Sequence, residues 1–182
     1  MKSPELEIYC NEAVRDYIYK AASHEFEKDV ESRLHFHIVK PFEPFTAGSY
    51  TVTPLPAEHM KTEQAMLYLI ERGESSLLYA HDTGRFYPQV FEFLKNRKKP
   101  LKIISLDCTS GCYENGENGG HMGLPDTVVV KNRLFADGSA DENTRFVLNH
   151  FSHNGKWLYD ELVQRAEKEN MEVSFDGMTV EF

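Results

Sequence analysis

Four residues that can hold a metal ion each stand at the end of a stretch predicted to be a buried strand. His59 follows "TVTPLPAE", Asp82 follows "LLYAH", Asp107 ends "KIISLD" and His150 follows "RFVLN". Side chains at the carboxyl ends of strands in an α/β sheet converge on one crevice, where ligands bind. Histidine and carboxylate together suit zinc, manganese or iron. Each residue alone is equally well explained as a turn former, so it is the repetition that favours a metal site.

Other residues with ligand chemistry carry weaker signals. His153 lies three residues beyond the last strand end, where it either orients its neighbour, lines the pocket or simply begins a helix. His81 directly precedes Asp82 and, because strand side chains alternate, should point to the opposite face. Cys108 and Cys112 form a single C-x-x-x-C, which lacks the second half of a cysteine metal motif. We therefore count neither His81 nor the cysteines as ligands.

The stretches between these residues alternate between strand and helix patterns. Strands are expected within 5–10, 49–59, 101–108 and 144–152, hairpins within 65–84 and 171–182, and helices within 11–27, 85–100, 125–138 and 155–169. Pro54 and Pro56 are expected to halt the second strand, and Asp176-Gly177 to form the last hairpin turn. Thr109 to Gly120 has four glycines in twelve residues, which indicates a loop that shapes the site. The pattern predicts an α/β fold.

Composition limits the function classes. The 182 residues, 41% of them hydrophobic, predict one domain over 1–182. A net charge of −9 and a pI of about 5.4 argue against nucleic-acid partners, and the basic run "KNRKKP" is explained as a solvated helix end. Absence of a long apolar run argues against a membrane partner. The start lacks the order of a signal peptide, and three unpaired cysteines suit a reducing compartment, so a cytoplasmic location is expected.

Four motifs in order resemble one known family. "PLPAEHMK", "LLYAHDTG", "SLDCTSG…GGHMG" and "VLNHFSHNG" resemble the metallo-β-lactamase-fold hydrolases, in particular the phosphodiesterase branch that includes the cyclic phosphodiesterase of the carbon–phosphorus lyase pathway. The resemblance covers nearly the whole chain. It implies part of a four-layer αββα sandwich, with a mixed sheet and helices on the outer faces.

The resemblance also implies roles for single residues. His59 resembles the third histidine of the first metal, Asp82 the carboxylate that bridges both metals, and His150 the last ligand of the second metal. His121 resembles the substrate-side histidine, which stabilises developing charge or protonates the leaving oxygen. Under this resemblance Asp107 anchors a loop or supports a metal ligand. A purely structural role, in which the carboxylate caps the end of the strand, explains Asp107 equally well.

The implied chemistry is hydrolysis of a small phosphodiester. In the family, two divalent ions about 4 Å apart, here zinc or manganese, hold a hydroxide that attacks phosphorus in line. Metal binding lowers the pKa of the bound water to about 7, so that hydroxide forms near neutral pH.

The family's H-x-H-x-D-H motif, which donates four of seven metal ligands, is absent from this sequence. His35 and His37 in "LHFHIV" have H-x-H spacing, but no D-H follows, and by order they match a segment after the motif. We therefore expect a C-terminal portion of the family domain that supplies part of a one- or two-ion site, with hydrolysis by this chain alone in doubt. A homo-oligomer or a partner chain would cover the exposed part of the sheet. The alternative is a non-catalytic binding or assembly module derived from the fold.

Overall fold

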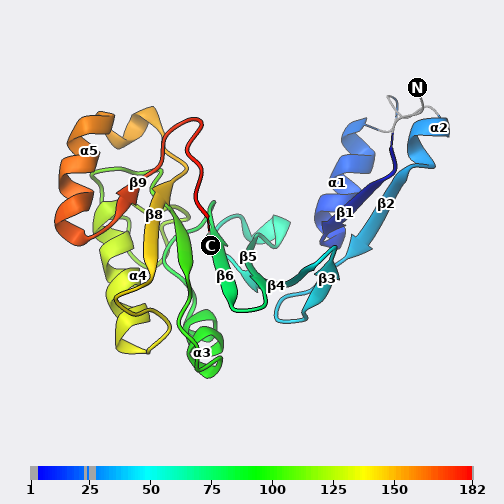
Figure 1. The fold of residues 1–182 in the computed structure, drawn as a ribbon. Helices are drawn as coiled ribbons and strands as arrows, with labels where there is room; N and C mark the ends of the chain where they lie inside the picture. Colours follow the sequence, from blue (N-terminus) through cyan, green and yellow to red (C-terminus); the bar gives the residue numbers. More distant parts are fainter. Residues whose placement is uncertain (1–3, 23, 25–27, 182) are drawn as a thin grey trace.

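The computed structural model describes residues 4–22, 24 and 28–181. Its strands are β1 (Leu6–Cys10), β2 (Leu34–Ile38), β3 (Phe45–Ala47), β4 (Tyr50–Pro56), β5 (Met66–Arg72), β6 (Ser75–Ala80), β7 (Ile103–Asp107), β8 (Arg145–Asn149) and β9 (Glu172–Val173). Its helices are α1 (Glu12–Ala22), α2 (Lys28–Glu31), α3 (Pro88–Asn96), α4 (Leu124–Ala136) and α5 (Tyr159–Ala166), with 3-10 turns η1 (Lys61–Glu63), η2 (His153–Gly155) and η3 (Glu167–Glu169). Within these residues the strands form a two-stranded sheet, β1-β2, and a mixed seven-stranded sheet in the order β3 to β9 (Figure 1).

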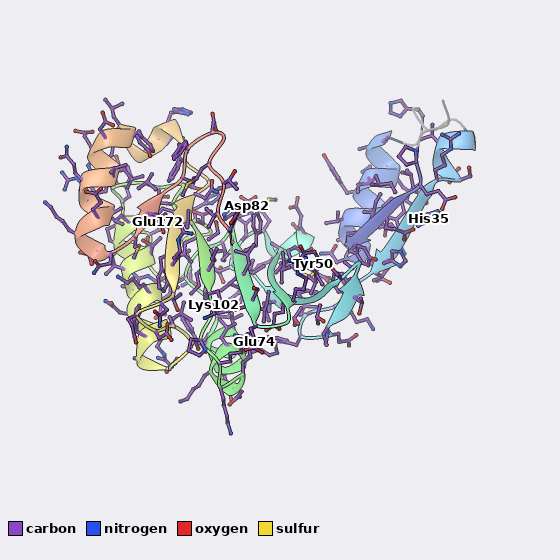
Figure 2. All side chains as sticks on the ribbon, viewed as in Figure 1. His35, Tyr50, Glu74, Asp82, Lys102 and Glu172 are labelled. Atoms are coloured by element: carbon purple, nitrogen blue, oxygen red, sulfur yellow. The ribbon has the colours of Figure 1, made fainter. Side chains whose placement is uncertain are left out.

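The strand directions bring four carboxyl ends to one edge of the large sheet. Neighbours from β3 to β6 are antiparallel, whereas β6, β7, β8 and β9 are parallel. Strand β4 therefore runs in the same direction as β6, β7 and β8. Figure 2 shows Asp82 at the sheet edge opposite Glu74 and Lys102, which precede β6 and β7. The α/β mixed sheet predicted from the sequence is confirmed.

One face of the seven-stranded sheet packs against three helices. Alternate residues of the parallel strands share one core with helix residues, as the pleat requires: Leu78, Ala80, Ile104, Leu106, Phe146 and Leu148 from the strands, and Val90, Leu94, Val130, Leu134, Leu162 and Ala166 from α3, α4 and α5. This core makes the strands a rigid platform for the loops that follow them.

Among the described residues, no helix packs on the opposite face of the parallel strands. Leu77, Tyr79, Ile103, Ser105 and Val147 line a groove of about 770 Å³ on this face, and the segment 174–180 forms its other wall. The groove reaches the sheet edge, because His150 also lines it.

The β1–α1–β2 unit projects beside β3 and β4 (Figure 1). Its contact with the larger sheet is made in part by Asn11, whose amide nitrogen donates to the carbonyls of Glu63 (2.8 Å) and Gln64 (2.9 Å). His35 and His37 lie on one face of β2; His35 contacts Glu5, just before β1, and His37 contacts Glu7 on β1. Figure 2 shows His35 on this unit, far from Asp82.

Two predictions about strand ends are wrong in part. Strand β4 ends at Pro56, as expected, but it continues through Pro54, because the carbonyl of Pro54 accepts from the amide of Phe42 on the side away from β5. The nitrogen of Pro54, which carries no hydrogen, points to that same side, so no bond of the β4–β5 ladder is lost.

The predicted C-terminal hairpin is the second error. The turn at Asp176-Gly177 exists, with the amide of Met178 donating to the carbonyl of Phe175 (2.9 Å), but residues 174–181 form no strand. They cross the open face of the sheet instead of folding back on β9.

Helix ends also differ from the prediction. Helix α5 begins at Tyr159 instead of residue 155, because η2 and Lys156, with a φ of +65°, come first. The predicted helix 11–27 is confirmed as far as Ala22, while residues 23 and 25–27 lie outside the described residues. No helix in the described part of the chain has the length and apolar character needed to cross a membrane.

Candidate metal centre

The centre of the site is the carboxylate of Asp82, which lies between two histidines. Its Oδ1 is 3.6 Å from Nε2 of His59 and 3.4 Å from Nε2 of His150. Two ligands of a tetrahedral zinc ion with bonds of about 2.0–2.1 Å are themselves roughly 3.3 Å apart. Each pair, Asp82 with His59 and Asp82 with His150, therefore has nearly the spacing of two ligands of one ion. The side chain of Asp82 is 58% exposed, so solvent or substrate can reach it.

Backbone geometry turns two of these side chains out of their strands. Asp82 and His150, just beyond β6 and β8, have φ of +50° and +60°. This left-handed region is rare for non-glycine residues and is tolerated best by Asp, Asn and His. The His59 and Asp82 loops are also tied together, since Gly84 N donates to the carbonyl of Glu58 (2.8 Å) and Thr83 Oγ1 accepts from Glu58 N (3.1 Å).

Thr109 determines which nitrogen of the His150 ring carries the hydrogen. Its hydroxyl donates to the carbonyl of His150 (2.7 Å) and lies 2.7 Å from Nδ1 of the same residue. Because a hydroxyl has a single hydrogen, Nδ1 must donate to it. The lone pair of neutral His150 is therefore on Nε2, which is the atom beside Asp82.

Asp107 is buried with its side chain 0% exposed. Its Oδ1 accepts from the amides of Thr109 (2.9 Å) and Met122 (3.1 Å), and its Oδ2 from Nδ1 of His121 (2.9 Å) and, at 3.4 Å, the amide of Thr83. Each oxygen thus already has two protein donors. Asp107 holds the loops that carry the other site residues.

His121 enters the site from the irregular loop between β7 and α4. With Nδ1 bonded to Asp107, its Nε2 is the ring nitrogen left for other contacts. The ring is 4.9 Å from that of His59 and 5.8 Å from that of His150, between centroids. The loop from β7 therefore delivers His121 against two of the strand-end histidines.

Ligand-type atoms of Asp82, Asp107, His121 and His150 all lie within 4.8 Å of one another. The structure thus brings together five residues proposed from the sequence, since His59 contacts Asp82 as well. The oxygens of Asp107 and Nδ1 of His121 are engaged with each other. The ligand-type atoms that stay free are those of His59, Asp82 and His150 and Nε2 of His121.

Two further histidines lie outside the cluster. His153 begins η2 and is exposed, and no contact found among the described residues joins it to the site. His81 lies on the groove side, where Nε2 is 2.7 Å from Oγ of Ser105. Burial, reinforced by the nearby charge of His150, lowers the pKa of His81 to about 4, so its ring is neutral at neutral pH.

Sequence reasoning missed the residues that orient the site. Thr83 directly follows Asp82, and Thr109 comes two residues after Asp107. This proximity to a candidate ligand was the only feature of the sequence that could have indicated their role. Nothing in the sequence indicated that Asn115 and Asp126 would hold the loop of His121.

The comparison of sequences with protein families decides the family. A model described as the beta-lactamase superfamily domain matches residues 1–151. The chain belongs to the beta-lactamase superfamily. No curated protein matches this superfamily member significantly.

Solved structures show the same fold. The metallo-beta-lactamase fold protein YhfI from Bacillus subtilis is 19% identical, with a TM-score of 0.68 over 96% of this chain and 64% of that chain. Yeast PDE1 is 16% identical, with a TM-score of 0.71 over 97% and 60%. Zn²⁺-bound PqqB from Methylobacterium extorquens is 14% identical, with a TM-score of 0.68 over 98% and 65%. This superfamily member thus spans less than two thirds of the length of each structure. At these identities the likeness shows the metallo-beta-lactamase-type fold, as predicted.

Proposed function

We propose that this chain supplies one part of the active site of a metal-dependent phosphodiester hydrolase. The observation that carries the proposal is the position of Asp82 Oδ1 between Nε2 of His59 and Nε2 of His150, at 3.6 and 3.4 Å. The two nitrogens and the carboxylate match the donors that zinc and manganese accept in proteins. Membership of the superfamily and the Zn²⁺-bound state of PqqB, a protein of similar fold, support the same proposal.

The residues that fit a metal are His59, Asp82 and His150. When bound there, one or two divalent ions would supply Lewis-acid polarisation and an acidic water as nucleophile. Three ligands leave coordination positions open. The H-x-H-x-D-H motif of the family, absent from this sequence, would complete a two-ion site if a partner chain of different sequence carries it.

His121 is the residue proposed to act on the phosphate. Asp107 holds its Nδ1 (2.9 Å) and fixes the ring plane, so Nε2 is the nitrogen that can exchange a proton with the substrate. A donor at this position stabilises charge that develops on a phosphoryl oxygen, or protonates the leaving oxygen. Asp107 acts through His121 and does not need to contact substrate.

The open sheet face favours a second candidate function. The groove beside His150 and the missing family motif fit a binding or assembly module that has kept part of the site without catalysis. Metal binding without hydrolysis, by the chain alone or with added partner, would favour this function.

Metal binding tests the proposal first. The purified 182-residue chain is titrated with Zn²⁺ and with Mn²⁺ by calorimetry, beside an Asp82→Ala, His150→Ala double variant and a His153→Gln control. We expect stoichiometric binding by the wild type and His153→Gln, and at least a 100-fold loss of affinity in the double variant. Equal binding by the double variant, or none by the wild type, would overturn the proposed metal site.

Hydrolysis is measured next on the metal-loaded chain, with a cyclic phosphodiester and bis(4-nitrophenyl) phosphate as substrates. Turnover that disappears in His121→Gln while metal affinity is retained would support the assigned role of His121. Turnover that is unchanged in this variant would contradict that role.

A further inference from the structure

A second buried carboxylate lies behind the loop that carries His121. Asp126, the third residue of α4, has its side chain 0% exposed. It accepts hydrogen bonds from Nε of Arg85 (2.8 Å) and from the amides of Asn115 (2.9 Å), Gly116 (3.1 Å) and Gly123 (3.1 Å). One carboxylate therefore joins the segment after β6, the β7–α4 loop and the first turn of α4.

Asn115 connects this carboxylate to His121. Its backbone amide bonds to Asp126, and its side-chain nitrogen donates to the carbonyl of His121 (3.0 Å) and to Oγ of Ser110 (2.6 Å). The loop closes tightly on Asn115, since a Cβ added to Gly119 would lie 2.4 Å from that of Asn115. His121 is thus held at its backbone by Asn115 and at its ring by Asp107.

Arg85 connects the same assembly to Asp82. It stands three residues beyond Asp82, and its side chain is only 17% exposed. Besides the bond from Nε to Asp126, its Nη2 donates to Oε1 of Glu114 at 2.6 Å. The guanidinium therefore ties the Asp82 segment to the His121 loop through one charge-assisted hydrogen bond to each of two carboxylates.

We propose that Arg85 and Asp126 are positioning residues, which set the placement of His121 relative to the Asp82 metal site through Asn115. The inference rests on the proposed function, because the placement of His121 matters for catalysis only if His121 acts on a substrate beside the metal. Neither residue is part of the ligand set, and both act through the loop. A displacement of about 1 Å in a reacting group is enough to lower a rate by about 100-fold.

The test uses the full chain in variants of graded severity. Arg85→Gln removes both bonds to the carboxylates, and Arg85→Lys keeps the charge without the planar pair of donors. Asn115→Ala removes the side-chain bonds to the His121 carbonyl and to Oγ of Ser110, and keeps the backbone bond to Asp126. Arg133→Gln is the control, because Arg133, on α4, also bonds to a carboxylate, that of Asp137, but is exposed. Far-ultraviolet circular dichroism establishes that each variant is folded.

The first readout does not depend on activity. Histidine side-chain ¹⁵N resonances are recorded for each variant, and that of His121 is assigned from its loss in His121→Gln. We expect Arg85→Gln and Asn115→Ala to shift or broaden the His121 resonances and to leave those of His150 in place, with Arg85→Lys intermediate and Arg133→Gln unchanged. If both Asn115→Ala and Arg85→Gln are folded and the His121 resonances are unchanged in both, the inference is overturned. If Arg85→Gln does not fold, unchanged His121 resonances in Asn115→Ala are enough to overturn it.

The second readout is kinetic. With Zn²⁺ or Mn²⁺ bound, Arg85→Gln should lower kcat on a cyclic phosphodiester by about 10- to 100-fold with KM and metal affinity changed less than about threefold. A fall in metal affinity with kcat retained would contradict a positioning role toward His121. If the wild type does not hydrolyse any phosphodiester, the proposed hydrolytic function is contradicted. The His121 resonances still show whether the network positions His121.

Discussion

Asp107 supports the site through one buried carboxylate, which accepts from His121 and from the amides of two loops. A buried charge of this kind persists only where donors surround it. Loss of the negative charge of Asp107 should therefore disturb every loop that bonds to this carboxylate.

Asp107→Asn tests this assignment. The amide group of asparagine would face backbone N–H groups that need an acceptor, so we expect the free energy of unfolding to fall by roughly 2–4 kcal/mol. Urea denaturation followed by circular dichroism measures the change. Glu74→Gln, at a side chain that is 93% exposed, should change it by less than about 0.5 kcal/mol. A loss below about 1 kcal/mol in Asp107→Asn would show that the carboxylate is not needed as an acceptor.

The cysteines give a second prediction at this scale. Cys10 and Cys108 are buried and Cys112 is partly exposed. Burial raises the pKa of both buried thiols, that of Cys108 to about 12. At pH 8 the thiolate, which is the reactive form, is scarce in both. An aromatic disulfide reagent should therefore react quickly with one thiol per native chain and with three in urea. Cys112→Ser should remove the fast phase, and its persistence would contradict the assignment.

At the scale of elements, the β7–α4 loop and η2 are held together by two glycines. Gly111 has a φ of +50°, and a Cβ there would lie 2.3 Å from the carbonyl oxygen of Gly155. The amide of Cys112 donates to that same oxygen (3.0 Å). The contact aligns the loop of His121 with the segment that follows His150.

Gly111→Ala should separate these two segments. We expect a loss of more than about 3 kcal/mol in the free energy of unfolding, because the substitution combines an unfavourable φ with a clash against backbone. Gly138→Ala is the matched control: its φ is +74° but its Cβ would meet open space, so the loss should be about 1 kcal/mol. Similar losses in the two variants would exclude a special role for the close approach. Thermal unfolding measures both.

The last strand is held to its neighbour by an ion pair. Nε and Nη2 of Arg145 on β8 bond to the two carboxylate oxygens of Glu172 on β9, at 2.7 and 2.8 Å. The hydrogen bond from Arg145 lowers the pKa of Glu172. The folded state therefore binds this proton less tightly than the unfolded state does, so the stabilisation is present above the unfolded pKa of about 4.3 and is lost as pH falls through the folded value.

Glu172→Gln should thus lower stability at pH 7 and not at pH 3. Since both side chains are partly exposed, at 43% and 39%, the loss at pH 7 should not exceed about 1 kcal/mol. Urea denaturation at the two pH values measures it. An equal loss at both would mean that the charge of Glu172 does not stabilise β9.

At the scale of the whole molecule, Asn11 joins the β1–α1–β2 unit to the rest of the protein. Asn11 is 5% exposed. Its Oδ1 accepts from the amide of Val14 (2.8 Å) at the start of α1, while Nδ2 donates to the carbonyls of Glu63 and Gln64 in η1. The same side chain thus caps a helix and joins the two sheets.

Asn11→Asp separates these tasks, because aspartate can still cap the helix and cannot donate to the carbonyls. We expect faster amide hydrogen exchange in residues 4–38 and unchanged exchange in β6, β7 and β8. Asn11→Ala should add fraying of α1. Protection of residues 4–38 that is unchanged in Asn11→Asp would show that other contacts hold the unit.

The sequence by itself determined the α/β alternation and the types of residue at the strand ends. Apolar periodicity is a local property, so strands such as β6, β7 and β8 and helices such as α4 could be located from it. His59, Asp82 and His150 were recognisable as candidates because each stands within three residues of the end of a strand. The roles of these residues toward a metal stay a prediction.

Only the tertiary structure decided what lies beside what. The order β3 to β9 and the shared direction of β4, β6, β7 and β8 depend on contacts between segments far apart in the chain. The approach of His121 to Asp107, and the network through Asp126, arise from a glycine-rich loop without periodicity, for which no local pattern predicts a path. The C-terminal segment crosses the groove instead of pairing because its position depends on an open sheet face, which the local sequence does not encode.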